Sequence, residues 1–279
     1  MKIIADSSST RTEWAIVEGD RMVEQAFTSG LNPYFQSRRD LSHAIRLELP
    51  EVFFKRRWDH VYFYGAGCAN KEKNKIMESS LVAQFRTPVT VESDLLGAAR
   101  GLLVREEGLA CIIGTGSNSC LYDGHEIVRN IAPLGYILGD EGSGTYLGKV
   151  FLADVLKGIA PENLISEFYA AYQVSPNMLM DTVYTNGLPQ RALARYSGFL
   201  AERQDNDYVY NLVYTGFKLF ISRNIMLYSH MPENGIRIVG STAVTYRSIL
   251  ERAAADYGIV IDRIEPRSMP GLIAYHAEE

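Results

Sequence analysis

The sequence predicts an α/β protein that contains two copies of one three-stranded unit. An apolar strand runs into a short, hydroxyl-rich turn twice, 109 positions apart, within residues 2–10 and residues 110–117. Each turn leads into a second strand, at residues 12–17 or 118–122, and a polar reversal then opens a third, at residues 21–27 or 126–131. The repeat predicts two related halves.

Strands and helices alternate after the first unit, which is typical of a mixed sheet with helices packed on it. Helices are predicted at residues 37–56, 72–85 and 94–103, with Asp94 as the cap of the last, and strands at residues 60–64, 89–92 and 236–239. Residues 145–230 are mostly helical in pattern, and a further helix ends near residue 257. We expect a first domain at 1–108, completed by the segment 268–279, and a second at 109–267.

Composition indicates an ordinary globular chain. Its 279 residues exceed what one core usually serves, so two domains are expected. A net charge of −5 argues against non-specific binding of nucleic acid or anionic membranes. The sequence shows no signal-peptide pattern and no apolar run near ~18 residues, which predicts a cytoplasmic protein.

Several common motifs are absent from the sequence. The three cysteines, Cys68, Cys111 and Cys120, are too few and too irregularly spaced for a disulfide framework or a zinc site. The Gly148-Lys149 pair lacks the other residues of a P-loop, and the nearby glycines have the wrong spacing for a dinucleotide fingerprint. No metalloprotease or serine hydrolase motif occurs.

The two hydroxyl-rich turns therefore carry the chemical signal. Small residues at a strand-to-strand turn let backbone amides approach an anion closely, and their hydroxyls add hydrogen-bond donors. Two facing copies of such a turn predict a clamp for phosphate groups.

Four segments together resemble a known family. They are residues 6–12, Gly114-Thr115-Gly116-Ser117, residues 138–144 and residues 239–242. Their order resembles the BadF/BadG-type ATPase branch of the actin-like ATPase and sugar kinase superfamily, the branch that contains the N-acetylglucosamine kinases. The resemblance covers essentially the whole chain. It implies two actin-like, ribonuclease H-like lobes, each a mixed five-stranded sheet with flanking helices, and a nucleotide in the cleft between them.

The resemblance also implies roles for individual residues. Asp6 matches the aspartate that positions Mg²⁺, usually through water, and Asp94 matches the catalytic base that takes a proton from the attacking sugar hydroxyl. The residues implied for ATP binding are Ser7, Ser8, Ser9, Thr10, Gly114, Thr115, Gly116, Ser117, Gly240 and Ser241. Those implied for sugar binding are Asn32, Asn118 and Asp140. The expected reaction is ATP-dependent phosphorylation of N-acetylglucosamine or a related N-acetylated sugar, and a homodimer is common in this branch.

Three departures from the family pattern stand out. Ser7, Ser8 and Ser9 replace three glycines of the first turn, and serine restricts positive φ angles where the backbone approaches phosphate. Residues 132–135 replace a Gly-Gly-Trp-Gly segment that lines the sugar pocket, and Ser241 stands where a second glycine is usual. A different amino sugar, such as N-acetylmuramic acid, is therefore a plausible acceptor.

The candidate site residues can also have purely structural roles, and two other functions remain as alternatives. Asp6 can serve as a turn-former, Asp94 and Asp140 as helix caps, and Asn32 as a turn-former before Pro33. The first alternative function is an ATPase that activates a radical dehydratase or reductase through a [4Fe–4S] cluster held between subunits, which needs accessible cysteine thiolates. The second is a sugar or nucleotide sensor without catalysis.

Overall fold

The computed structural model describes residues 1–185, 187–229 and 232–277. Contacts between Cα atoms divide the chain into two compact units. The first comprises Met1–Ala110, Cys120–Arg129 and Arg267–Glu279, and the second comprises Cys111–Ser119 and Asn130–Pro266.

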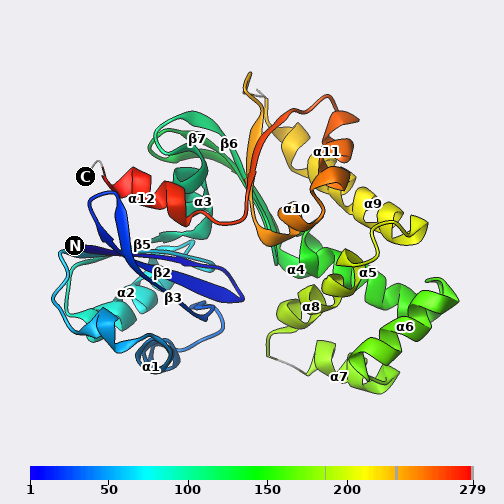
Figure 1. Cartoon of the computed structure of the whole chain (residues 1–279), viewed down its shortest axis with the longest axis horizontal. Coiled ribbons are helices and arrows are strands. Elements are labelled where there is room, and N and C mark those ends of the chain that lie inside the picture. The colour runs from blue at the N-terminus through cyan, green and yellow to red at the C-terminus, as the bar shows by residue number, and fades with distance from the viewer. Residues whose placement is uncertain (186, 230–231, 278–279) are drawn as a thin grey trace. The chain divides into compact units, whose positions relative to one another are not determined.

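Sheet 1 of the first unit has five strands in the order β3-β2-β1-β4-β5 (Figure 1). The strands are β1 Lys2–Ser7, β2 Arg11–Glu18, β3 Arg21–Ser29, β4 His60–Gly65 and β5 Val89–Ser93. The β1-β2-β3 meander is antiparallel, whereas β4 runs parallel to β1 and β5 parallel to β4. The sheet is therefore mixed, as the sequence predicts.

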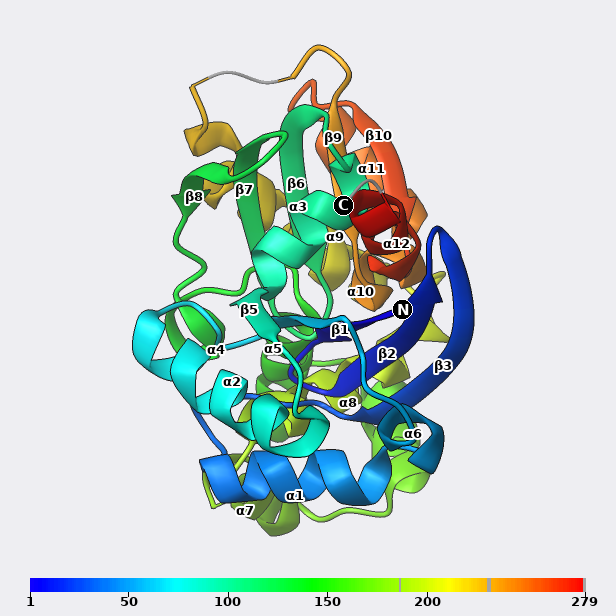
Figure 2. The same cartoon turned by 90° about the vertical axis from the view of Figure 1, so that its left-hand side faces the viewer.

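Side chains of β1 alternate between two hydrophobic clusters. Ile3 and Ala5 belong to a cluster beneath α1 (Arg38–Glu48), η1 (Glu51–Phe54) and α2 (Lys71–Phe85), and α1 and α2 lie side by side (Figure 2). Ile4 belongs to the cluster on the other face, which includes residues of α12 (Met269–Ala277). Helix α3 (Asp94–Leu103) packs against α12.

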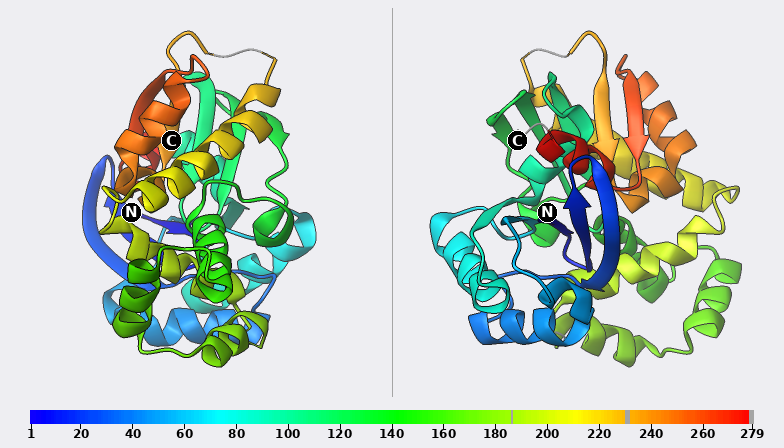
Figure 3. Two further views of the ribbon diagram at one scale, coloured as in Figure 1. Left: turned by 90° about the vertical axis from the view of Figure 1, so that its right-hand side faces the viewer. Right: turned by 60° about the vertical axis from the view of Figure 1, so that its left-hand side comes forward.

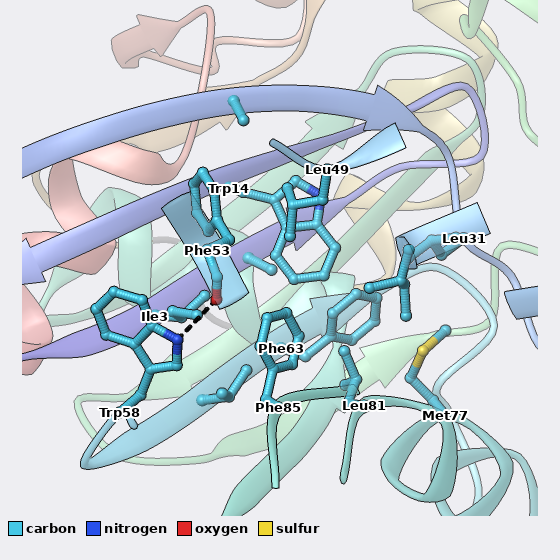
Figure 4. Packing of buried hydrophobic residues seen from close by; sticks show 14 of the residues in the cluster. Ile3, Trp14, Leu31, Leu49, Phe53, Trp58, Phe63, Met77, Leu81 and Phe85 are labelled. Atoms are coloured by element: carbon cyan, nitrogen blue, oxygen red, sulfur yellow. Dashed lines mark hydrogen bonds between the residues drawn. The ribbon is translucent and has the colours of Figure 1, made fainter. Parts of the chain in front are cut away.

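Aromatic rings dominate the cluster under α1 and α2 (Figure 4). Trp14 lies within 6.1 Å of the Phe63 ring centroid and 6.0 Å of that of Phe85. The indole N–H of Trp58 donates to the backbone carbonyl of Phe53 at 2.8 Å, so this buried polar group is satisfied.

The helix predicted at residues 37–56 is wrong in its second half. Helix α1 ends at Glu48, and the short 3₁₀ helix η1 follows Pro50. Leu49, directly before Pro50, has an extended backbone (φ −82°, ψ 134°). A residue before proline is disfavoured in the α region, which explains the break.

Sheet 2 repeats the strand order of sheet 1. Its order is β10-β9-β6-β7-β8, which read from the opposite edge places β8-β7-β6-β9-β10 against β3-β2-β1-β4-β5. The strands are β6 Glu107–Ile113, β7 Ser117–Asp123, β8 Ile127–Ile131, β9 Ile236–Val239 and β10 Ile261–Glu265. The predicted duplication and the α/β fold with two mixed five-stranded sheets are confirmed. The residue patterns did not locate β10.

The second unit is largely helical between β8 and β9. Its helices are α4 Gly135–Leu138, α5 Gly144–Lys157, α6 Glu162–Tyr172, α7 Pro176–Tyr184, α8 Pro189–Ala201, α9 Asp207–Arg223, η2 Ile225–Leu227, α10 Ser241–Thr245 and α11 Arg247–Ala255. The single helix predicted up to residue 257 is thus two helices, α10 and α11. Helix α9, yellow in Figure 3, packs beside the orange α11. No helix in the described parts of the chain is long and apolar enough to cross a membrane.

Helices α3 and α12 approach each other through glycines. A Cβ atom built on Gly271 of α12 lies 1.8 Å from the carbonyl oxygen of Gly101 in α3, which is backbone and cannot turn aside. A Cβ built on Gly101 lies 2.7 Å from the Ser268 carbonyl oxygen. Only glycine at both positions allows this approach.

We predict that Gly271→Ala destabilises the protein by roughly 1–3 kcal/mol, because the new methyl group forces α12 away from α3. Gly198→Ala is the matched control. Gly198 is also helical, but its added Cβ meets nothing within 4 Å, so the better helix propensity of alanine adds up to about 1 kcal/mol of stability. Urea unfolding measures both changes, and equal stability of the two variants would contradict the packing argument.

Candidate functional site

Two carboxylates lie at one edge of sheet 1. Asp6 is near the carboxyl end of β1, and Asp94 follows directly after β5. Because β1, β4 and β5 run in the same direction, their carboxyl ends meet at the same edge. This edge is the usual place for ligand binding in parallel sheets.

Both carboxylates are held in a site that disfavours their charge. Burial raises the pKa of Asp6 to about 7, with a further rise from the negative charge of Asp94 and an opposing effect from hydrogen bonding to Ser268. Burial likewise raises the pKa of Asp94 to about 6. The pair therefore carries negative charge that the surrounding protein does not neutralise.

This donor set fits Mg²⁺ held mainly through water. Mg²⁺ keeps several waters in proteins and typically uses one or two carboxylates. Among the described residues no group of three or more His, Cys, Asp or Glu side chains forms a cage for a metal ion. Asp6 and Asp94 therefore match a Mg²⁺ site that uses one or two carboxylates and several waters.

Asp94 does not cap its helix, so that prediction is wrong. Ser93 is the N-cap of α3, and its hydroxyl accepts a hydrogen bond from the Leu96 amide at 3.2 Å. Asp94 is the first helical residue, and its Oδ1 accepts from the Leu95 amide at 2.9 Å. Since Ser93 satisfies the helix end, capping alone does not account for a carboxylate at position 94.

Two neighbours of Asp6, Glu13 and Ser268, were not predicted from the sequence. Glu13 of β2 stands directly opposite Asp6 in the antiparallel register, and its negative charge also raises the pKa of Asp6. Arg267 pairs with Glu13 at 3.1 Å, and Ser268 follows it in the chain. The hairpin register was a usable signal for Glu13. Ser268 gave none, since it lies 262 positions from Asp6 in sequence.

The first hydroxyl-rich turn is built largely from its own hydrogen bonds. The Ser7 hydroxyl lies 2.7 Å from that of Thr12 and also bonds the backbone of Leu31. The Ser8 hydroxyl accepts from the amides of Thr10 and Arg11, at 3.3 Å and 3.2 Å. No residue of this turn has a positive φ, so serine is accommodated where the family pattern has glycine.

Asn32 lies next to this turn, but it is partly used by its own loop. Its Oδ1 accepts from the Tyr34 amide at 2.9 Å, which is the hydrogen bond expected of a turn-former. A Cβ on Gly67 would lie 2.2 Å from this oxygen. The Nδ2 group has no hydrogen-bond partner among the described residues, which leaves a donor for a ligand.

The carbonyl groups of the second turn, Gly114 to Ser117, accept hydrogen bonds from neighbouring segments. The Gly114 carbonyl accepts from the Gly144 amide at 2.8 Å and from the Thr242 hydroxyl at 2.9 Å. The Thr115 carbonyl accepts from the amide and the hydroxyl of Thr145. The structure thus brings the turn together with α5 and with the 239–242 segment.

Gly240, predicted to border the nucleotide, has a conformation that requires glycine. Its φ is +135°, and an added Cβ would lie 2.4 Å from the carbonyl oxygen of Ile113. Ser241, also predicted at this position, is exposed at the start of α10. Gly240 thus lies against the end of β6, where the second turn begins, and the role of Gly240 and Ser241 at a nucleotide stays a prediction.

Asp140 and Asn118 flank the second turn. The Ser117 amide donates to Asp140 Oδ1 at 3.3 Å, and Asp140 has a left-handed backbone (φ +53°). Ser143, not Asp140, caps α5, so the capping reading of Asp140 fails. Asn118 Oδ1 accepts from Ser119 and Asn130, which fixes its amide plane.

All three cysteines are buried. Burial raises the pKa of both Cys68 and Cys120 to about 12, so these thiols stay protonated at neutral pH. Thiolates are the species that bind iron and act as nucleophiles. The cysteines are therefore poor candidates for cluster ligands at a surface between subunits.

Solved structures provide the comparison. A protein from Porphyromonas gingivalis, named as a candidate N-acetylglucosamine kinase, is 39% identical to this chain, with a TM-score of 0.94 over 100% of this chain and 99% of the other. A second candidate N-acetylglucosamine kinase, from Chromobacterium violaceum, is 16% identical, with a TM-score of 0.65 over 98% of each chain. A ROK family glucokinase from Streptomyces griseus, solved with glucose and AMPPNP, is 13% identical, with a TM-score of 0.64 over 98% of this chain and 97% of the other.

The last two proteins show a shared fold alone, because their identity is low. No protein-family model and no curated protein sequence matches the chain. The Porphyromonas gingivalis protein carries the assignment, since it is matched along nearly all of both chains. This chain therefore belongs to the family of sugar kinases with the actin-like ATPase fold.

Proposed function

We propose that this chain transfers the γ-phosphoryl group of ATP to a hydroxyl of an N-acetylated amino sugar, with N-acetylglucosamine as the first candidate. The paired carboxylates Asp6 and Asp94 at the parallel edge of sheet 1 carry the proposal. The name of the 39% identical relative supports the choice of sugar. Membership of the BadF/BadG branch stays a prediction.

Asp94 is the proposed general base. A pKa of about 6 leaves it ionised at neutral pH, and it remains more basic than an ordinary aspartate. A base with a pKa near the working pH is the most efficient at removing a proton in the transition state. Asp94 would take the proton of the attacking sugar hydroxyl.

Asp6 is the proposed Mg²⁺ residue, acting through water. Bound Mg²⁺ supplies charge neutralisation on the β- and γ-phosphates, which is the main requirement of phosphoryl transfer. The Ser268 hydrogen bond and the Arg267–Glu13 ion pair hold the surroundings of Asp6 in place. This chain's part is to orient the carboxylate toward the metal's water shell.

The sugar is proposed to contact two anchored amide groups and one carboxylate. Asn32 and Asn118 each have their side-chain oxygen bonded within the protein, which leaves both Nδ2 groups to donate to sugar oxygens. Asp140 is an acceptor suited to sugar hydroxyls.

The second turn, Gly114 to Ser117, is proposed to bind phosphate through its backbone.

The two alternatives are weaker. An electron-delivering ATPase needs accessible thiolates, and all three thiols are buried. A non-catalytic sensor has no need for two costly carboxylates at one edge of a sheet. Calorimetry shows whether ATP binds with Mg²⁺, and coupled ADP release then separates the kinase from a sensor, which would release no ADP with any sugar.

We predict that Asp94→Asn lowers kcat by about 10²–10⁴-fold while ATP still binds, because asparagine cannot accept the proton. Coupled ADP release is measured with ATP and Mg²⁺ against N-acetylglucosamine, N-acetylmuramic acid, glucosamine, N-acetylmannosamine and glucose. Ser93→Ala is a matched control that disturbs the same helix end and keeps the carboxylate. Turnover of Asp94→Asn within threefold of the wild-type value would exclude Asp94 as the base.

A second prediction concerns the pH dependence of kcat. The rate should fall about tenfold per pH unit below pH 6, because the protonated Asp94 carboxyl is no longer a base. The residual activity of Asp94→Asn should lack this limb. A wild-type rate that stays level between pH 7 and pH 5 would place the base elsewhere.

A third prediction concerns stability. Asp6 has a folded-state pKa of about 7 against an ordinary value of 3.8, so the folded state binds its proton more tightly than the unfolded state does. The carboxylate therefore destabilises the fold increasingly as the pH rises from about 4 to 7, by at most roughly 4 kcal/mol. Asp6→Asn should raise the Tm at pH 8 and leave it nearly unchanged below pH 4.

Thermal unfolding at both pH values tests this. Asp20→Asn, which removes an exposed carboxylate from the same unit, should leave the Tm nearly unchanged at both. If Asp6→Asn were less stable than the wild type at pH 8, Asp6 would be a structural residue.

A further inference from the structure

A basic groove lies on the first unit, among residues that the proposed kinase reaction does not use. It is a hollow of about 550 Å³ between α1 and α2. Its lining residues are Arg38, Arg39, Ser42, His43, Arg46 and Gln84. We call this hollow the α1–α2 groove.

The groove runs along the solvent-exposed side of α1, next to α2. Leu41 and Ile45 form the buried side of this helix, whereas Arg39, His43 and Arg46 follow one another at helical spacing on the exposed side. The eight-residue distance from Arg38 to Arg46 corresponds to about 12 Å along the helix axis. This length spans a compact ligand with more than one anionic group.

The positive charge in the groove is largely uncompensated. No ion pair of Arg38, Arg39 or Arg46 is found among the described residues. The nearby acid, Asp40, is bonded to the Ser37 hydroxyl in the capping box, and this hydrogen bond chiefly lowers its pKa. Asp40 offsets one of the three arginine charges, in a chain whose net charge is −5.

Two of these arginines are placed against the preference of the helix. Arg38 and Arg39 occupy the first two positions of α1, where the helix dipole disfavours cations. A local rule broken in this way is typical of a functional site. An anion bound by the arginines would remove the conflict.

Side chains of the groove are partly fixed before any ligand arrives. The Arg46 guanidinium lies 4.6 Å from the centroid of the Phe54 ring, and Gln84 Nε2 donates to the Ser42 hydroxyl at 2.6 Å. Fixed groups lose less conformational entropy on binding. The hollow is shallow and open to solvent, so its arginines can reach a ligand from solution.

We propose that the α1–α2 groove binds a small molecule that carries phosphate groups. The guanidinium fork matches phosphate oxygens in pairs, which a lysine ammonium does not. The groove is made of first-unit residues only and does not depend on the proposed kinase reaction. The ring N–H of His43 adds a further donor.

Calorimetric titration with pyrophosphate, in buffer with EDTA and without Mg²⁺, tests the proposal. The Arg39→Ala/Arg46→Ala variant should bind pyrophosphate at least about tenfold more weakly than the wild type, because two charge-assisted contacts are lost. Lys71→Ala/Lys75→Ala is the matched control, since it removes two exposed charges from α2 outside the groove. The control should bind within twofold of the wild type.

Both variants replace exposed helical residues with a strong helix former, and circular dichroism checks that they fold. Binding at the second turn would be equal in the two variants, so the affinity that only the arginine variant loses belongs to the groove. The proposal would be overturned if the two variants bound pyrophosphate with equal affinity, whether or not that affinity is lower than the wild-type value. It would also be overturned if the wild type did not bind pyrophosphate. Tighter groove binding of a poly-glutamate peptide than of pyrophosphate would also overturn it, in favour of an acidic protein partner.

Discussion

The burial of two carboxylates, Asp6 and Asp94, at one edge of sheet 1 is the constraint that the first unit has to accommodate. Two carboxylates near one another in a half-buried place lower the stability of the fold unless a cation joins them. The surroundings offset this loss of stability only in part. Asp6 is hydrogen-bonded to Ser268, and Asp94 accepts a hydrogen bond from the Leu95 amide. A site that keeps such a pair is typical of a functional centre.

The topology explains how these groups meet. Asp6 shares its face of β1 with Ile4, and this face belongs to the cluster that includes α12. Helix α3 begins at Asp94, and α12 begins directly after Ser268, so residues at the starts of both helices act on Asp6. The glycine contact between Gly101 and Gly271 brings the two helices close enough for this arrangement. Packing and chemistry therefore depend on the same pair of helices.

Much of this fold could be predicted from the sequence because the repeat is local. Each three-stranded meander is written in consecutive residues, and alternation with polar turns identifies it. The break at Pro50 could have been predicted, since the residue before proline is disfavoured in the α region, whereas the break at Tyr246 depends on the backbone of that residue (φ −111°, ψ 31°). Strand β10 lacks a clear alternation, since Asp262 and Arg263 are both exposed beside Ile264. Its assignment depends on parallel pairing with β9.

The residues of the candidate site also divide into those that local sequence identifies and those that depend on distant segments of the chain. Asp6, near the end of β1, and the Gly114 turn, after β6, could be found by position, whereas Ser268 reaches Asp6, and Arg267 reaches Glu13, only through the return of the chain to the first unit. The Ser93 cap was misassigned to Asp94 because both are good capping residues and lie side by side in sequence. Glu13 was accessible in principle, since a hairpin that closes at Ser7 and Thr12 sets Glu13 opposite Asp6.

The serine-filled first turn explains how the two halves of the repeat differ. The Ser8 hydroxyl takes the amides of Thr10 and Arg11, which are the kind of donors that a glycine turn would offer to phosphate. In the second turn the Gly114 amide donates to the Gly116 carbonyl at 2.9 Å, and the carbonyls of Gly114 and Thr115 accept from α5 and from Thr242. Duplication thus yields a first turn closed by a serine hydroxyl and a second turn closed by a backbone hydrogen bond and anchored to α5 and residues 239–242. Since the Ser8 hydroxyl occupies two amides of the first turn, the proposed reaction would depend in the first unit mainly on the carboxylates of Asp6 and Asp94.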